Sequence, residues 1–283
     1  MINAVISYLK HSPLATGKSK LYKLFRRQIE NMDPVWCQYD GDIHFLADLS
    51  DRIQRHVLMY GGYRTERRHK NFMIGRVQPG QVILDIGGHA GYYTLLFAKY
   101  TGSTGRVYSF EPNPDNHAIL EKNIQRNGFD NVELRREVVS DTSGPLRLYL
   151  PHQENTGNGS LYASPDTAFG NIEVQAINPD RFFQDKGIEK IDLIKIDVEG
   201  HEENVLRGLA HYLSQPAGTC PEVFVEVNEL TLQRAGKTPE QIFQLMDSMD
   251  YSAYRIEDGG VAKHVDQPFC DNLIYFKKSG KME

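Results

Sequence analysis

The stretch Asp85 to Gly91 reads Asp-Ile-Gly-Gly-His-Ala-Gly and constrains the fold of this 283-residue chain more than any other segment. It follows the apolar run 82–84 and precedes the amphipathic run 93–98. A buried strand, a glycine turn and a helix start in this order are typical of a cofactor site. Glycine admits left-handed backbone angles, and the helix start offers unpaired N–H groups. The sequence therefore predicts an α/β fold with a ligand beside this turn.

The glycine spacing narrows the choice of ligand. Gly87, Gly88 and Gly91 are spaced as G-G-x-x-G, and His89 stands where the dinucleotide fingerprint G-x-G-x-x-G has its second glycine. This weakens a pyrophosphate-binding interpretation. The remaining pattern, Asp85-x-Gly-x-x-x-Gly, is similar to the first motif of Rossmann-like S-adenosylmethionine-dependent methyltransferases. The structural alternative is a plain strand-to-helix turn.

Two further strand ends carry acids. The alternating strand 106–110 ends in Glu111-Pro112-Asn113, and an acid roughly 20 residues past the glycine turn suits hydrogen bonds to ribose hydroxyls. The next strand, 132–136, leads to Ser140-Asp141. The likeness to methyltransferases implies that this loop contacts adenine. The alternative is that serine and aspartate stand here only because they favour a turn.

The most specific stretch is 195–202, Lys-Ile-Asp-Val-Glu-Gly-His-Glu. With the glycine turn and the strand end Phe-Glu-Pro-Asn at 110–113, it resembles the FkbM family of S-adenosylmethionine-dependent methyltransferases. The resemblance covers about residues 55 to 278, including Ser160-Leu161 and a closing strand at 272–276. It implies methyl transfer, mostly to hydroxyl oxygens of sugars or natural products. Many relatives carry asparagine where His89 stands, which leaves the contact of position 89 with the methionine part of the cofactor open.

These observations predict one architecture and one cofactor site. The expected fold is a Rossmann-like, seven-stranded, mostly parallel sheet flanked by helices in three layers. We expect residues 1–70 to form an N-terminal helical extension that covers cofactor and substrate, and residues 71–283 to form the methyltransferase domain. The predicted S-adenosylmethionine contacts are Asp85, Gly87, Gly88, His89, Gly91, Glu111, Pro112, Asn113, Ser140, Asp141 and Asp197.

Four side chains are candidates for catalysis, because an aliphatic hydroxyl is a poor nucleophile until a base withdraws its proton. Asp197 ends a buried strand and should face the cofactor crevice. His201 is attractive as the base because its unperturbed pKa is about 6.5. Glu199 and Glu202 are candidates too, although both could instead satisfy backbone donors at a helix start.

A metal-assisted version is the alternative mechanism. Glu226 and Asn228 follow another buried strand and, with Asp197, form an oxygen-rich set that suits Mg²⁺. Such a set also arises simply because active sites lie at the carboxyl ends of parallel strands.

Composition limits the partners. A net charge of −5 argues against an electrostatic grip on nucleic acid, so we expect a small-molecule or saccharide acceptor. The three cysteines lack metal-ligand spacing and fit a reducing cytoplasm, and no segment reads as a transmembrane helix or a targeting signal.

The basic segment 18–27 predicts a packed amphipathic helix in preference to a membrane contact. Residues 153–171 read as a mobile loop, and the oligomeric state is not predicted.

Two other functions compete with an O-methyltransferase. An NAD-linked oxidoreductase would use the same kind of sheet, but the missing middle glycine disfavours it. A binding protein without turnover could keep the fold, yet the intact acids at 85, 111, 141 and 197 speak against loss of activity.

Overall fold

The computed structural model describes residues 1–283 except 13–16, 152–158, 165–169 and 279–283. Its centre is an eight-stranded sheet in the order β12-β11-β13-β10-β9-β3-β4-β5. The strands are β3 (Val82–Ile86), β4 (Arg106–Phe110), β5 (Val132–Arg135), β9 (Leu193–Ile196), β10 (Glu222–Val227), β11 (Tyr251–Glu257), β12 (Val261–His264) and β13 (Asp271–Lys278). Neighbours from β5 to β10 pair in parallel, and β13, β11 and β12 add antiparallel partners.

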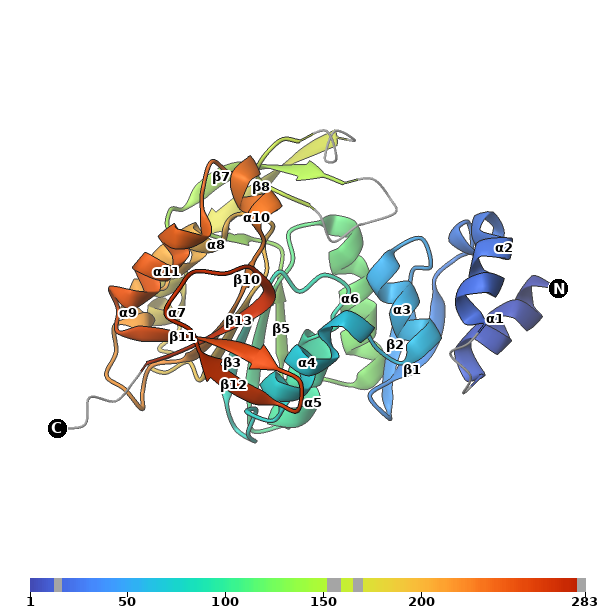
Figure 1. Ribbon diagram of the computed structural model, residues 1–283, viewed down its shortest axis with the longest axis horizontal. Coiled ribbons are helices and arrows are strands. Elements are labelled where there is room, and N and C mark those ends of the chain that lie inside the picture. Colours follow the sequence, from blue (N-terminus) through green and yellow to red (C-terminus); the bar gives the residue numbers. More distant parts are fainter. Residues whose placement is uncertain (13–16, 152–158, 165–169, 279–283) are drawn as a thin grey trace.

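Helices cover both faces of this sheet (Figure 1). They are α4 (Arg67–Ile74), α5 (Thr94–Thr101), α6 (Pro114–Asn127), α7 (Pro179–Asp185), α8 (Glu202–Gly208), α9 (Ala210–Leu213), α10 (Glu229–Arg234) and α11 (Pro239–Asp247). Side chains alternate between two cores: Ile83 packs with Leu96 of α5, whereas Leu84 packs with Leu206 of α8. This alternation is what a sheet buried on both faces requires.

The predicted Rossmann-like, three-layer fold is thus confirmed, with one strand more than the seven expected. The extra strand, β12, is a four-residue edge strand whose side chains are mostly exposed. It therefore lacks the apolar run that identifies a buried strand in the sequence.

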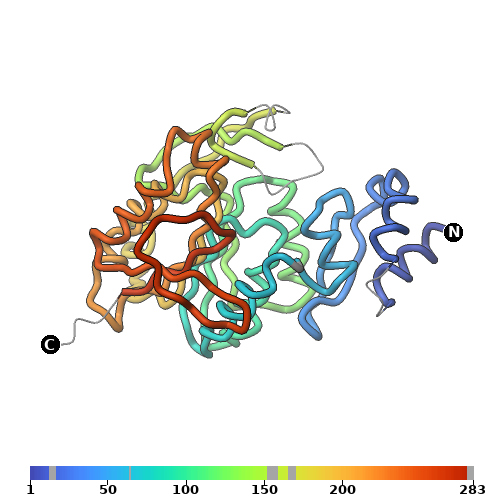
Figure 2. Tube along the Cα trace, in the orientation of Figure 1, coloured from blue at the N-terminus to red at the C-terminus, as the bar shows by residue number. Residues whose placement is uncertain are grey.

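An N-terminal part precedes the sheet. It contains α1 (Ile2–His11), α2 (Lys18–Glu30), the hairpin β1 (Val35–Tyr39) and β2 (Ile43–Ala47), α3 (Arg52–Tyr60) and the 3₁₀ turn η1 (Arg64–Glu66). Figures 1 and 2 show it beside α6, at the end of the molecule away from α9 and α11. Asn123 and Asn127 of α6 accept hydrogen bonds from the N–H groups of Leu46 and His44 at 2.6 and 2.8 Å, which fastens the hairpin to the sheet domain.

The basic segment 18–27 belongs to α2, a helix with Ile29 buried and Leu21 and Phe25 packed against the core. The predicted packed amphipathic helix is confirmed. Among the residues that the structure describes, no helix combines the length and the apolar character needed to cross a bilayer.

A small second sheet lies beyond β5. Its order is β6-β8-β7, with β6 (Val138–Val139), β7 (Gly144–Leu150) and β8 (Gly170–Ile177). Part of the predicted mobile loop, 153–158 and 165–169, lies outside the described residues, while Ser160 pairs with Tyr149 of β7 as an isolated bridge.

Candidate active site

The glycine turn after β3 is shaped by close packing. Gly87 has a φ of 86°, and a Cβ there would lie 1.9 Å from the carbonyl oxygen of Asp197. A Cβ on Gly88 would lie 2.4 Å from Ser109 Oγ, and one on Gly91 2.6 Å from a methyl of Leu120. The glycines are therefore required by neighbouring protein atoms, whatever ligand lies beside the turn.

Asp85 lies behind this turn and does not line the cavity. Its carboxylate is fully buried, accepts a hydrogen bond from Thr94 Oγ1 at 2.6 Å and lies 3.4 Å from Lys195 Nζ. Burial raises the pKa of Asp85 although the Lys195 ammonium opposes the rise. A direct cofactor contact for Asp85 stays a prediction, and the contacts shown are those of a residue that holds the turn.

Lys195 links the glycine turn to the second functional turn. Its ammonium donates to the carbonyl oxygen of Gly87 at 2.8 Å and lies 3.5 Å from Asp197 Oδ2. Sequence reasoning placed Lys195 within the 195–202 motif but gave it no role. The available signal was a lysine inside an otherwise apolar strand, a position where a charge must be paired.

A cavity of about 830 Å³, counting the part open to solvent, lies at the carboxyl ends of the parallel strands. A concave site at this edge of the sheet is where ligands bind in open α/β folds. Eight of the predicted site residues line it: Gly87, His89, Glu111, Pro112, Asn113, Asp197, Glu199 and His201. The other lining residues are Ile53, Ile86, Phe110, Asn116, Glu137, Val138, Val139, Leu148, Gly159, Leu161 and Val198.

Glu111 forms a polar wall of the cavity. Its carboxylate accepts hydrogen bonds from the backbone N–H groups of His89 at 2.7 Å and Asn113 at 2.9 Å. Burial raises the pKa of Glu111, with His89 and these donors opposing the rise. The Asn113 side chain in turn accepts from Asp115 N at 3.0 Å and caps α6, so the strand end and the helix start fix each other.

Ser140 and Asp141 lie outside the cavity lining. Asp141 Oδ1 accepts from Ser140 Oγ at 3.0 Å and from Asn204 Nδ2 at 3.1 Å. The wall nearest to them is made instead by the stretch 137–139, which directly follows β5. The adenine contact of Asp141 stays a prediction that these distances do not favour.

The turn after β9 is also held tightly. Glu199 has a φ of 54°, unusual for a residue with a side chain, and Gly200 follows at 104°. Ser160 Oγ donates to the carbonyl oxygen of Glu199 at 2.9 Å, while Glu202 Oε1 accepts from the N–H groups of Val198 and Gly200 at 3.2 and 3.0 Å. Glu202 thus has the helix-start role considered for it above.

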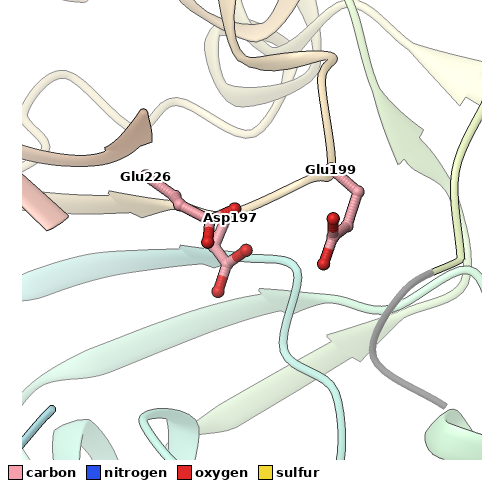
Figure 3. A group of neighbouring side chains, drawn as sticks. All are labelled: Asp197, Glu199 and Glu226. Carbon is pink, nitrogen blue, oxygen red and sulfur yellow. The ribbon is translucent and has the colours of Figure 1, made fainter. Parts of the chain in front are cut away.

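Three carboxylates meet at this turn: one oxygen each from Asp197, Glu199 and Glu226 lies within 4.8 Å of the others (Figure 3). Burial, reinforced by Asp197, raises the pKa of Glu199 to about 8 and that of Glu226 well above its usual range. The Asp197 side chain is 38% exposed and opens to the cavity. The Asn228 side chain accepts a hydrogen bond from Leu230 N at 3.0 Å and caps α10, and its part in a metal site stays a prediction.

His201 has both ring nitrogens engaged. Nδ1 lies 3.1 Å from the Tyr162 hydroxyl, and Nε2 lies 3.0 Å from Ser140 Oγ. Burial, with Lys237 nearby, lowers the pKa of His201 to about 4. The imidazole is therefore neutral near pH 7. Each of its two nitrogens already has a hydrogen-bond partner in the protein.

Comparison with known proteins identifies the family of this chain. A family profile described as "Methyltransferase FkbM domain" matches residues 85–253. The chain is 25% identical to the hexuronic acid methyltransferase AglP of Haloferax volcanii over 189 residues, 67% of this chain and 71% of that protein. It is 29% identical to the 31-O-demethyl-FK506 methyltransferase FkbM of Streptomyces tacrolimicus, covering 47% of this chain and 61% of that one.

Two more matches are a curated relative and a solved structure. The 2-O-methyltransferase NoeI of Sinorhizobium fredii is 26% identical over 50% of this chain and 62% of its own length. Among solved structures, a methyltransferase FkbM from Methylobacillus flagellatus is 16% identical, covering 71% of this chain and 44% of that one, with a TM-score of 0.47.

Proposed function

Because this chain belongs to the FkbM methyltransferase family, we propose that it transfers a methyl group from S-adenosylmethionine to a hydroxyl oxygen of a sugar, a glycan or a natural product. Methyl transfer itself follows from the family. The hydroxyl acceptor is supported by relatives whose names specify a hexuronic acid or O-methylation.

The residues that line the cavity support binding of S-adenosylmethionine. The Glu111 carboxylate is a hydrogen-bond acceptor suited to two ribose hydroxyls, and Gly87 presents backbone without a side chain. Phe110, Val138 and Leu161 provide apolar walls for a flat base. When bound, the cofactor supplies an electrophilic methyl group on a sulfonium.

The observation that carries the proposal is the carboxylate pair Asp197 and Glu199 on the same cavity as Glu111. A hydroxyl placed about 3 Å from the methyl carbon needs a base within hydrogen-bond reach. Glu199, whose pKa burial raises to about 8, is largely protonated near neutral pH, and its ionised fraction is a stronger base than an ordinary carboxylate. We therefore assign proton removal to this pair.

His201 is the less suitable base, because its basicity is low and both ring nitrogens are engaged. We give it a positioning role for the turn after β9.

The N-terminal residues contribute to the same site. Ile53 of α3 lines the cavity, and Asp51 Oδ2 lies 3.7 Å from His89 Nε2 of the glycine turn. These contacts support the proposal that part of residues 1–70 covers the bound cofactor and acceptor. No observation favours the NAD-linked oxidoreductase or the binding-protein alternative.

The test is incubation of the purified protein with methyl-labelled S-adenosylmethionine and a panel of neutral sugars, uronic acids and polyhydroxylated natural products. We expect label in a product whose NMR spectrum shows a new O-methyl group. Transfer confined to nitrogen or carbon acceptors would overturn the hydroxyl assignment, and thermal stabilisation by NAD without stabilisation by S-adenosylhomocysteine would overturn the cofactor assignment.

A further inference from the structure

The carboxyl groups of Asp197, Glu199 and Glu226 place one oxygen each within 4.8 Å of the others, too close for all three to be ionised without a proton or a cation between them. Lys195 lies 3.5 Å from Asp197 but also serves Asp85. Like charges this close require a proton or a cation between them. The group therefore calls for a further positive charge.

Glu226 points to the nature of that charge. Its Oε2 atom is enclosed and has no hydrogen-bond donor among the described residues, and its carboxyl group lies within hydrogen-bond reach of the Asp197 carboxylate, a contact that needs a bridging proton or cation. Figure 3 shows its carboxylate beside that of Asp197, with the Glu199 carboxylate on the other side of Asp197. An enclosed acceptor without a donor costs free energy unless something binds it. A ligand at this position must bind several carboxylate oxygen atoms at once.

A divalent metal ion meets these requirements. Mg²⁺ takes oxygen ligands at about 2.0–2.1 Å in octahedral geometry, which places neighbouring ligand oxygens roughly 3 to 4 Å apart. The three carboxylate oxygens already lie within 4.8 Å of one another, so a contraction of about 1 Å would close them around one ion. Such ions usually keep positions for water or substrate oxygens.

We propose that Asp197, Glu199 and Glu226 bind one divalent metal ion of the Mg²⁺ or Mn²⁺ type, and that the ion selects acceptors with two adjacent oxygen atoms. Asp197 and Glu199 line the cavity, so the ion is within reach of an acceptor there. A hydroxyl bound to it loses its proton more readily, and that proton passes to a neighbouring carboxylate. The acceptor preference rests on the proposed function, whereas ion binding does not.

The test is a titration of the purified full-length protein with Mn²⁺, without cofactor or acceptor, followed by the electron paramagnetic resonance signal of free Mn²⁺. We expect loss of free signal with one ion per chain and its return on addition of Mg²⁺. Glu226→Gln should weaken Mn²⁺ binding by about tenfold or more, comparable to removing a ligand or its close support. Glu257→Gln, at an exposed position at the end of β11, is the matched control and should bind as the wild type does.

Absence of Mn²⁺ binding by the wild type, or equal binding by the wild type and Glu226→Gln, would overturn the proposal. The first result would mean that a proton, or a cationic group of the acceptor, occupies the position. Circular dichroism verifies the fold of each variant, and Asp197→Asn replaces Glu226→Gln if the latter does not fold. Since no methyl transfer is measured, an incorrect acceptor class would leave this result unaffected.

Discussion

Two turns at the same edge of the sheet, after β3 and after β9, are built alike and differ in what they present. Each contains a residue with a side chain in the left-handed region, His89 with a φ of 48° and Glu199 with a φ of 54°. The first turn keeps its carboxylate, Asp85, buried behind it and paired with Thr94 and Lys195. The second directs Asp197 into the cavity.

The difference separates binding from chemistry. The turn after β3 presents backbone groups, which suits recognition of a ligand by its shape. The turn after β9 presents closely spaced carboxyl groups, which suits proton transfer or cation binding. Lys195 touches both, through Gly87 O at 2.8 Å and Asp197 at 3.5 Å, and so fixes their separation. Variants of the two turns should therefore affect different quantities.

The largest effect is expected in the first turn. Gly87→Ala would place a Cβ 1.9 Å from Asp197 O at a φ of 86°, so we expect a loss of about 3 kcal/mol or more in the free energy of unfolding. Binding of S-adenosylhomocysteine should fall by about 100-fold. Urea unfolding and calorimetric titration measure the two quantities.

Gly128→Ala is the control for Gly87→Ala, because Gly128 also has a positive φ, 64°, but a Cβ added there would meet no neighbouring atom within 4 Å. It should cost about 1 kcal/mol through backbone strain alone. Equal losses in the two variants would show that the close approach between the turns is unimportant.

Variants of the turn after β9 should change the rate of methyl transfer. Asp197→Asn removes a cavity-lining carboxylate, and we expect methyl transfer to fall by about 100-fold or more while S-adenosylhomocysteine affinity changes by about threefold at most. Asp141→Asn serves as the matched control, since Asp141 contacts Ser140 and Asn204 outside the cavity lining. A large loss of cofactor affinity in Asp141→Asn would restore the adenine contact predicted for it.

Much of this comparison can be read from the sequence, because β3 and β9 are mostly apolar, β4 alternates, and glycine or an acid follows each of these strands. This pattern locates the Asp85-to-Gly91 turn and the 195–202 run. The sequence could not show that Asp85 faces away from the cavity, because that depends on the pairing of β3 with β9, which brings Lys195 beside it.

Other parts were missed because their signal is not local. The hairpin β1–β2 is fastened by Asn123 and Asn127, which lie 77 and 83 residues away from their partners. The carboxylate of Glu199 joins those of Asp197 and Glu226, a proximity that the sequence does not indicate because it depends on the turn after β9. The sequence predicts His201 as a base, but it does not show that Tyr162 and Ser140 contact its two ring nitrogens in the folded chain.

The smallest effect concerns His201 and pH. Its pKa is about 4 in the folded chain and about 6.5 when unfolded, so the stabilisation is present above pH 6.5 and is lost as the pH falls toward 4. Between about pH 7 and about pH 5 the loss should be about 2 kcal/mol. His201→Asn should lack this component in urea unfolding measured across the range, and its methyl transfer should fall by about tenfold at most. An unchanged pH slope would contradict the burial of a neutral imidazole.

The most direct test of the division between the two turns is a crystal structure with S-adenosylhomocysteine bound. We predict the ribose hydroxyls on Glu111, the adenine between Phe110 and Leu161, and the sulfur facing the cavity side of Asp197 and Glu199. A cofactor bound elsewhere, or one whose sulfur faces away from these two carboxylates, would contradict that division.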